Sequence, residues 1–139
     1  MAFEAHELTA EEQARRKEIS TKTRRMIIRT LAVEDEDDTS LTLLFDEFFL
    51  QISFSDLHPL MVIHFVHGMG RRLTMQDKER INGLNQQCIL GGHALNTQLG
   101  CYSYRTTLWL DAELSAERFL EILYRNLTEA RRGYHALAA

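Results

Sequence analysis

The chain has 139 residues, which is room for one domain and too little for a second independent hydrophobic core. Apolar residues make up 45% of it and charged residues 26%, a composition that excludes disordered, collagen-like and disulfide-scaffold classes. Its formal net charge of −4 provides no general attraction to nucleic acid or to anionic lipid. We therefore expect one globular domain over residues 1–139 that binds neither nucleic acid nor membranes.

The sequence contains no recognisable targeting or membrane segment. Residues 1–12 carry four glutamates and have neither the basic nor the apolar region of a signal peptide. No apolar run approaches the roughly 20 residues that a membrane-spanning helix needs. Cys88 and Cys101 lack the spacing of a zinc or redox motif, and we expect both to be free thiols. These features predict a cytoplasmic protein.

A long first helix is predicted from residue 9 to about residue 31. Thr9 and Glu12 have the spacing of a capping box, and apolar residues recur behind them at helical spacing. Glutamates four residues before Arg15, Arg16 and Lys22 indicate a solvated, charged face and not a nucleic-acid surface. The acidic run at residues 34–38 then breaks the pattern, because adjacent like charges repel, and it predicts a loop.

Three short segments at residues 41–45, 48–54 and 60–67 predict an antiparallel meander. They are rich in β-branched, aromatic and aliphatic residues, and polar turns separate them. In the second segment, apolar residues alternate with Gln51 and Ser53, so we expect one buried face and one solvated face. The third segment is apolar at both alternations, so we expect both of its faces to be covered.

The second half of the chain begins with a turn and a short helix. Thr74 and Asp77 form a second capping box for this helix, which is predicted to end near residue 85. Strands follow at about residues 91–97 and 101–110, and a tight turn that contains Gly100 joins them. These two strands complete a predicted set of five.

The final helix is predicted to begin at the cap Ser115 and to end near Gly133. Its apolar residues, Phe119 and Leu123 among them, form one stripe that should face the core. The resulting order is α-β-β-β-α-β-β-α. This order predicts the α+β class, with an antiparallel five-stranded sheet packed with helices.

Two short segments carry a resemblance to a known family. The sequence INGLN at residues 81–85 ends the second predicted helix, and LSAERF at residues 114–119 opens the last one. Together with the order of elements over roughly residues 23–134, they resemble the YbjN family, whose members are regarded as bacterial sensory transduction regulators. The resemblance implies a fold similar to that of type III secretion chaperones, which are small, acidic, dimeric and non-catalytic.

One loop combines glycines and arginines in front of a helix. Gly68, Met69, Gly70, Arg71 and Arg72 lie between a predicted strand and the start of the second helix. In that context backbone N–H groups and the helix dipole can hold an anion. The loop lacks the third glycine of a dinucleotide-binding motif and the Lys-Ser/Thr of a P-loop. Gly68, Gly70, Arg71 and Arg72 are the candidate ligand-binding residues, and a plain glycine turn with exposed arginines is the alternative.

Other combinations of reactive residues do not match a catalytic or metal-binding pattern. His64 and His67 are three apart on a predicted strand and point to opposite faces, so they cannot chelate one metal ion. The acidic run does not fit a calcium loop, because Ser40 stands where the loop needs glycine. Neither cysteine lies in a nucleophile motif, nor does any serine. We predict no metal, no cofactor and no enzymatic activity.

These observations predict a binding protein. We expect a non-catalytic bacterial protein-binding or chaperone-like regulatory module with an unidentified protein or peptide partner. The alternative is a ligand-sensing domain that binds an anionic small molecule at the loop of residues 68–72. We also expect a homodimer, with the third strand, the fifth strand or the first helix at its centre, because three helices cannot cover all the apolar side chains of those strands.

Overall fold

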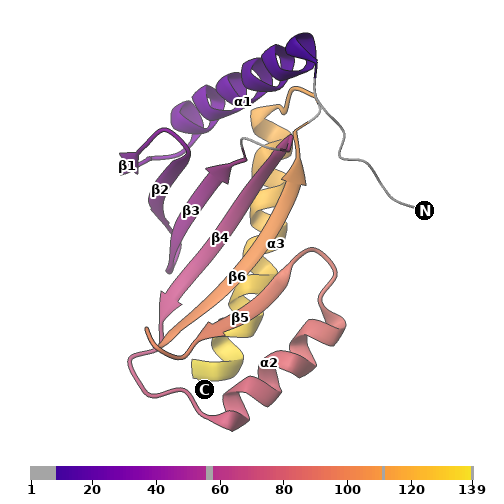
Figure 1. The fold of residues 1–139 in the computed structure, drawn as a ribbon. Helices are drawn as coiled ribbons and strands as arrows, with labels where there is room; N and C mark the ends of the chain where they lie inside the picture. Colours follow the sequence, from indigo (N-terminus) through magenta and orange to yellow (C-terminus); the bar gives the residue numbers. More distant parts are fainter. Residues whose placement is uncertain (1–8, 56–57, 111, 139) are drawn as a thin grey trace, which may run out of the picture.

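The computed structural model describes residues 9–55, 58–110 and 112–138, which form three helices and one sheet (Figure 1). The helices are α1 (Ala10–Thr30), α2 (Met75–Gln87) and α3 (Ala116–Ala138). The strands are β1 (Asp35–Glu36), β2 (Ser40–Phe45), β3 (Phe48–Phe54), β4 (Leu60–Gly68), β5 (Gly92–Asn96) and β6 (Cys101–Trp109). None of the helices described has a stretch that is long and apolar enough to cross a membrane.

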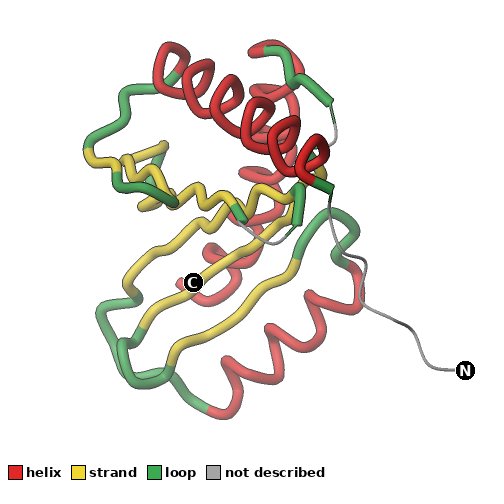
Figure 2. Tube along the Cα trace, turned by 45° about the horizontal axis from the view of Figure 1, so that its top comes forward, coloured by secondary structure: helices red, strands yellow, loops and turns green. Residues whose placement is uncertain are grey.

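All neighbouring strands of the sheet are antiparallel, and their order is β1-β2-β3-β4-β6-β5. The first four strands follow one another as a meander, and α2 then leads the chain to the edge strand β5. Figure 1 shows α3 behind the strands and α1 at the upper end of the sheet, and Figure 2 shows α2 beside β5. The predicted mixture of helices with an antiparallel sheet is confirmed.

The sheet has six strands in the described residues, not the five that the sequence predicts. The additional strand is β1, which lies in the acidic run and pairs with β2. Arg24 of α1 forms an ion pair of 3.4 Å with Glu36, and Asp37 accepts hydrogen bonds from the backbone N–H groups of Thr39 and Ser40. Successive side chains on a strand point to opposite faces, so the like charges are separated and the run can pair with β2.

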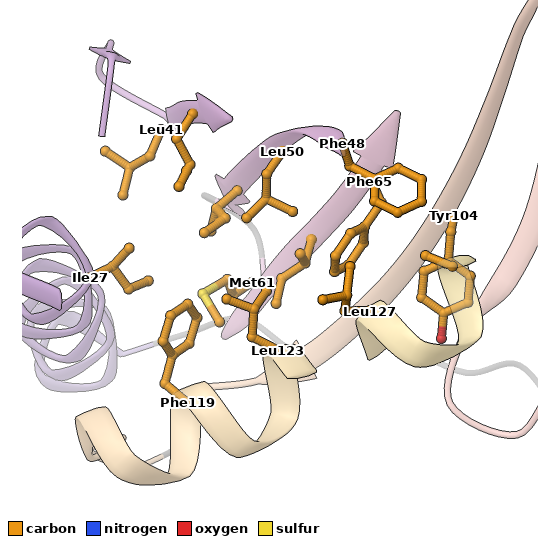
Figure 3. Packing of buried hydrophobic residues seen from close by; sticks show 14 of the residues in the cluster. Ile27, Leu41, Phe48, Leu50, Met61, Phe65, Tyr104, Phe119, Leu123 and Leu127 are labelled. Atoms are coloured by element: carbon orange, nitrogen blue, oxygen red, sulfur yellow. The ribbon is translucent and has the colours of Figure 1, made fainter. Parts of the chain in front are cut away.

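The hydrophobic core lies between one face of the sheet and the helices α1 and α3 (Figure 3). We name this side of the sheet the inner face and the opposite side the outer face. Alternate residues of β3 and β4 point inward, and Leu50, Met61 and Phe65 are fully buried. Phe119 and Leu123 of α3 are also fully buried, which confirms the predicted inner stripe of the last helix.

Helix α3 continues past Gly133, where the sequence pattern predicts its end. Gly133 is buried, and a Cβ atom at this position would collide with the hydroxyl of Tyr102 and the ring of His93. The glycine therefore allows α3 to approach β5 and β6 closely. It does not terminate the helix.

Candidate protein-binding face

Alternation along the strands determines which side chains point away from the core. On β3 and β4, buried positions alternate with partly or fully exposed ones, so every second side chain lies on the outer face. No described helix lies in front of β3, β4 and β6 in Figure 1. By strand register, the outer face includes Asp35, Thr42, Leu44, Phe49, Gln51, Ser53, Leu60, Val62, His64, Val66, Ser103, Arg105, Thr107 and Trp109.

Large apolar side chains are exposed on the outer face in two places. Leu44 is 64% exposed and Phe49 is 45% exposed, and the register sets them side by side, with Val66 next in the row. Trp109 is 65% exposed and lies opposite Leu60 toward the other end of β4. Large apolar patches are uncommon on monomeric proteins and usually mark an interaction site. The outer face therefore has the character of a binding surface.

The prediction that both faces of β4 are covered is wrong for the outer face. Met61 and Ile63 are fully buried, whereas Val62 and Val66 remain only partly buried. The core residues of α1 and α3 pack against the inner face, and α2 lies at the β5 edge (Figure 2). The outer side chains of β4 are thus shielded only by the neighbouring strands.

A polar row runs between the two apolar places. Thr42, Gln51, His64 and Arg105 are register partners on β2, β3, β4 and β6, and Asp35 of β1 continues the row at the sheet edge. Burial, and to a lesser extent the charge of Arg105, holds the pKa of His64 below its ordinary value of 6.5, so the ring is neutral at pH 7. Among the described strand residues of the outer face, only Asp35 and Arg105 are then charged.

The two edges of the sheet are poorly suited to accept a further strand. The side-chain amide of Asn85 donates to the carbonyl oxygen of His93 at 2.9 Å and accepts from its N–H at 2.7 Å, as a neighbouring strand would. At the opposite edge, β1 has only two residues, and both are acidic. Short and charged edge strands protect a sheet against strand addition. A partner therefore reaches the outer face more readily than either edge.

The loop of residues 68–72, the candidate anion site, makes several contacts within the chain. It starts at Gly68, the last residue of β4, and Gly70 has a positive φ of 66°, which suits a glycine turn. Arg71 donates two hydrogen bonds of 2.8 Å to the carboxylate of Asp77 and one to a carbonyl oxygen in the last turn of α3. The chain thus supplies its own anion at the start of α2. Arg72 is exposed, and anion binding at this loop stays a prediction.

A second group of polar side chains joins α3 to the connection between α2 and β5. The carboxylate of Glu129 accepts hydrogen bonds from the hydroxyl of Tyr104 at 2.5 Å, the N–H of Ile89 at 3.2 Å and the thiol of Cys88 at 3.3 Å. Burial raises the pKa of the Cys88 thiol, which makes it a poor nucleophile. Both cysteines are free, as predicted. We assign this group a structural role, because its donors and acceptors bind one another.

Within the described ranges, no three His, Cys, Asp or Glu side chains lie close enough together to hold a metal ion. His64 and His67 lie on opposite faces of β4, because three positions along a strand reverse the side-chain direction. The prediction that these two side chains point to opposite faces of the sheet is therefore confirmed.

The sequence pattern does not single out the outer face as a site. The sequence offers only a weak signal, the two apolar doublets Leu43-Leu44 and Phe48-Phe49, and the register places Leu44 of the first opposite Phe49 of the second. Adjacent apolar residues on a strand supply one side chain to each face. Only the tertiary structure shows that the helices cover one of these faces and leave the other open.

Solved structures with a similar fold include a type III secretion chaperone. No family model matches the chain, and no curated protein matches it. The Yersinia pestis type III secretion chaperone SycH, solved with a fragment of YscM2, matches with a TM-score of 0.55 at 10% identity over 82% of this chain and 98% of that one. The ExsC–ExsE complex matches with a TM-score of 0.66 at 17% identity over 87% of this chain and 94% of that one.

The YbjN structure from E. coli, a protein proposed to be a transcription regulator, shares the same fold. It matches with a TM-score of 0.64 at 12% identity, over 83% of this chain and 87% of that one. The resemblance to YbjN and to the chaperones is therefore confirmed at the level of the fold.

Proposed function

We propose that the protein is a non-catalytic, chaperone-like protein-binding module whose outer sheet face binds a partner polypeptide. The observation that carries this proposal is the exposure of Leu44, Phe49 and Trp109 on a face that no described helix covers. Burial of apolar surface is the dominant favourable contribution to most protein association. A partner that covers these side chains would gain this stabilisation.

Two observations on other proteins and on the sheet edges support the proposal. The structures of SycH and ExsC were solved in complexes, with a YscM2 fragment and with ExsE. The side chain of Asn85 protects the β5 edge, and β1 is short and acidic, so a partner can reach the outer face more easily than either edge.

We further propose that the chain works in the cytoplasm and regulates the partner that it binds.

The test compares the proteins captured by the wild-type chain with those captured by an outer-face variant. The variant Leu44→Ser/Phe49→Ser removes the exposed apolar pair and leaves the buried core intact. Ile89→Ser is the matched control, because Ile89 is 89% exposed and lies outside the sheet. We expect a protein that binds the wild-type chain and the control but not the face variant. Equal capture by all three chains would contradict the proposal.

The alternative, an anionic small molecule at residues 68–72, has a separate test. A ligand that binds only the folded state raises the apparent stability by RT ln(1 + [L]/Kd). A thermal-shift screen with nucleotides and phosphorylated metabolites would reveal such a ligand. The shift should disappear in Arg72→Ala, which removes the exposed guanidinium of the loop.

A further inference from the structure

The exposed apolar residues of the outer face mark the two ends of an elongated surface. At one end, Phe49 of β3 pairs with Val66 of β4, and Leu44 lies beside it. At the other end, Leu60 of β4 pairs with Trp109 of β6. Leu60 and Val66 are about 20 Å apart at about 3.3 Å per residue, and the line from Phe49 to Trp109 also crosses two strand spacings, about 10 Å. The two apolar ends are therefore about 22 Å apart.

The surface between these ends offers side chains and no free backbone groups. β3, β4 and β6 each have a hydrogen-bonded neighbour on both sides. A segment that binds there must satisfy its own N–H and C=O groups, because burying unpaired ones is unfavourable. A helix does this within itself, whereas an extended segment pairs at a sheet edge. Asn85 protects the β5 edge and β1 is short and acidic, so the geometry favours a helix on the face.

The surface also has the length and width of one helix. An α-helix rises about 1.5 Å per residue, so about 15 residues, or four turns, cover the distance, and its diameter is about 10 Å. Val62 and the neutral ring of His64 lie beneath this path on β4, and covering them places no charge in an apolar contact. Helix α3 already lies behind the same strands (Figure 1), so a helix on the outer face would complete a layered arrangement.

One charged side chain lies within reach of such a helix. Arg105 is exposed on β6 next to His64, beside the middle of the line from Phe49 to Trp109. Within the described ranges, its guanidinium forms no ion pair and no hydrogen bond. Asp35 lies on β1, four strand spacings or about 19 Å away, which is beyond the width of one helix. The middle of the surface therefore attracts a carboxylate and repels a cation.

We propose that the partner polypeptide binds the outer face as an amphipathic α-helix of about four turns, with apolar side chains toward both ends and a carboxylate near its middle that pairs with Arg105. This inference rests on the proposed function, since it identifies the kind of segment that occupies the same face. Leu44, Phe49 and Trp109 provide the apolar contact, and Arg105 determines specificity. A segment with a basic residue in the middle is rejected, because two cations would then face each other.

Selection from a displayed library of random peptides, each about 18 residues long, tests the helix and its charge with the full chain as target. Peptides that fail to bind Leu44→Ser/Phe49→Ser depend on the outer face. We expect these peptides to carry apolar residues at helical spacing and an excess of Asp or Glu near the middle. Selection on Arg105→Glu should replace that excess with Lys or Arg. Arg72→Glu is the matched control, because it makes the same charge change on an exposed residue outside the sheet.

Fluorescence anisotropy then measures the affinity of a selected peptide, and circular dichroism verifies that each variant of the chain is folded. Arg105→Glu should raise the dissociation constant about tenfold or more, and so should a lysine in place of the central acidic residue of the peptide. The two reversals together should restore most of the affinity, because the pair then has opposite charges again. A proline in the middle of the peptide should abolish binding, because it breaks the helix.

The outcomes separate this proposal from the proposed function. Face-dependent peptides without helical spacing, a charge preference that Arg105→Glu leaves unchanged, or no face-dependent peptide at all would overturn the proposal. A dimer that Leu44→Ser/Phe49→Ser abolishes and that excludes the peptides would assign the face to a second copy, and it would overturn the proposal as well. The proposed function fails separately, when the wild-type chain and the face variant capture the same proteins.

Discussion

Asp77 links three parts of the chain through one carboxylate. It accepts a bidentate pair of hydrogen bonds from Arg71 and a further bond of 2.7 Å from the backbone N–H of Thr74. Arg71 continues the connection to the carbonyl oxygen of Leu137 in the last turn of α3. The hydrogen bonds from Arg71, followed by the bond from Thr74, hold the pKa of Asp77 well below its ordinary value of 3.8.

We predict that Asp77→Asn lowers the urea midpoint at neutral pH, because an amide cannot accept both hydrogen bonds from Arg71. The pKa of Asp77 is depressed on folding, so its stabilisation is present above pH 3.8 and is lost as the pH falls through the folded value. The difference between wild type and variant should therefore narrow in acid. Glu79→Gln, an exposed carboxylate of the same helix, is the control. A midpoint equal to wild type at neutral pH would contradict this role.

The local part of this residue network could be predicted from the sequence, and the distant part could not. The spacing of Thr74 and Asp77 predicts the capping box, and the structure contains it with both reciprocal bonds. The bond from Arg71 to Leu137 joins residues 66 positions apart, and no local pattern reports such a contact. Arg71 therefore looks like an available cation in the sequence although its donors are used inside the chain.

At the scale of elements, two helical glycines with different surroundings provide a matched pair. Gly133 of α3 packs against Tyr102 and His93, whereas Gly83 of α2 has open space where a Cβ would be. We predict that Gly133→Ala destabilises the fold by roughly 1 to 3 kcal/mol, because the added methyl group overpacks the contact. Gly83→Ala should stabilise it by roughly 0.5 to 1 kcal/mol through reduced backbone entropy of the unfolded chain. Urea denaturation measures both, and equal effects would refute the packing argument.

The inner stripe of α3 supplies a second prediction at this scale. Phe119 and Leu123 are both fully buried, and Figure 3 shows them on the side of α3 that faces the strands. Replacing either residue with alanine should destabilise the fold by roughly 2 to 5 kcal/mol, because the cavity cannot close completely. Thr128→Ala on the exposed side of the same helix should change stability by no more than about 0.5 kcal/mol. Unfolding midpoints near wild type for both core variants would show that the stripe is not buried.

The elements themselves could be predicted well, because their periodicity and caps are local signals. The helix that begins at the Thr74 cap and the strand of residues 48–54 agree with the sequence pattern. The end of α3 and the strand β1 could not be predicted, since each depends on a tertiary contact. From the sequence, Gly133 is typical of a helix end, and only the contact with Tyr102 shows that this glycine lies inside α3. The sequence likewise indicates a loop at Glu36, and only the ion pair with Arg24 shows how the acidic segment is stabilised as a strand.

At the scale of the whole molecule, the helices cover one face of the sheet and leave the other open, and this difference could not be predicted from the sequence. Period-two patterns show that β4 is apolar on both sides, but they do not show how many helices pack on each side. The outer face remains open because the helical core residues of α1 and α3 pack against the inner face. The surplus of apolar surface that the sequence predicts on the third and fifth predicted strands is confirmed only in Trp109, because Tyr102 and Tyr104 are fully buried. The exposed Leu44 and Phe49 lie on the two strands before them, so the position of the surplus could be found only from the fold.

The edge strand β5 is protected against the addition of a further strand by the side chain of Asn85, and this protection can be tested. Its side chain binds both the N–H and the carbonyl oxygen of His93, which are the edge groups that a foreign strand would use. In Asn85→Ala these groups are free, so we expect faster hydrogen exchange at the His93 amide and a rise of light scattering with concentration. Asn82→Ala, an exposed asparagine of the same helix, should leave both unchanged. A wild-type exchange rate of the His93 amide in Asn85→Ala would contradict this prediction, because it would show that the Asn85 side chain does not protect the β5 edge. The edge contacts of Asn85 would then no longer support binding of a partner at the outer face.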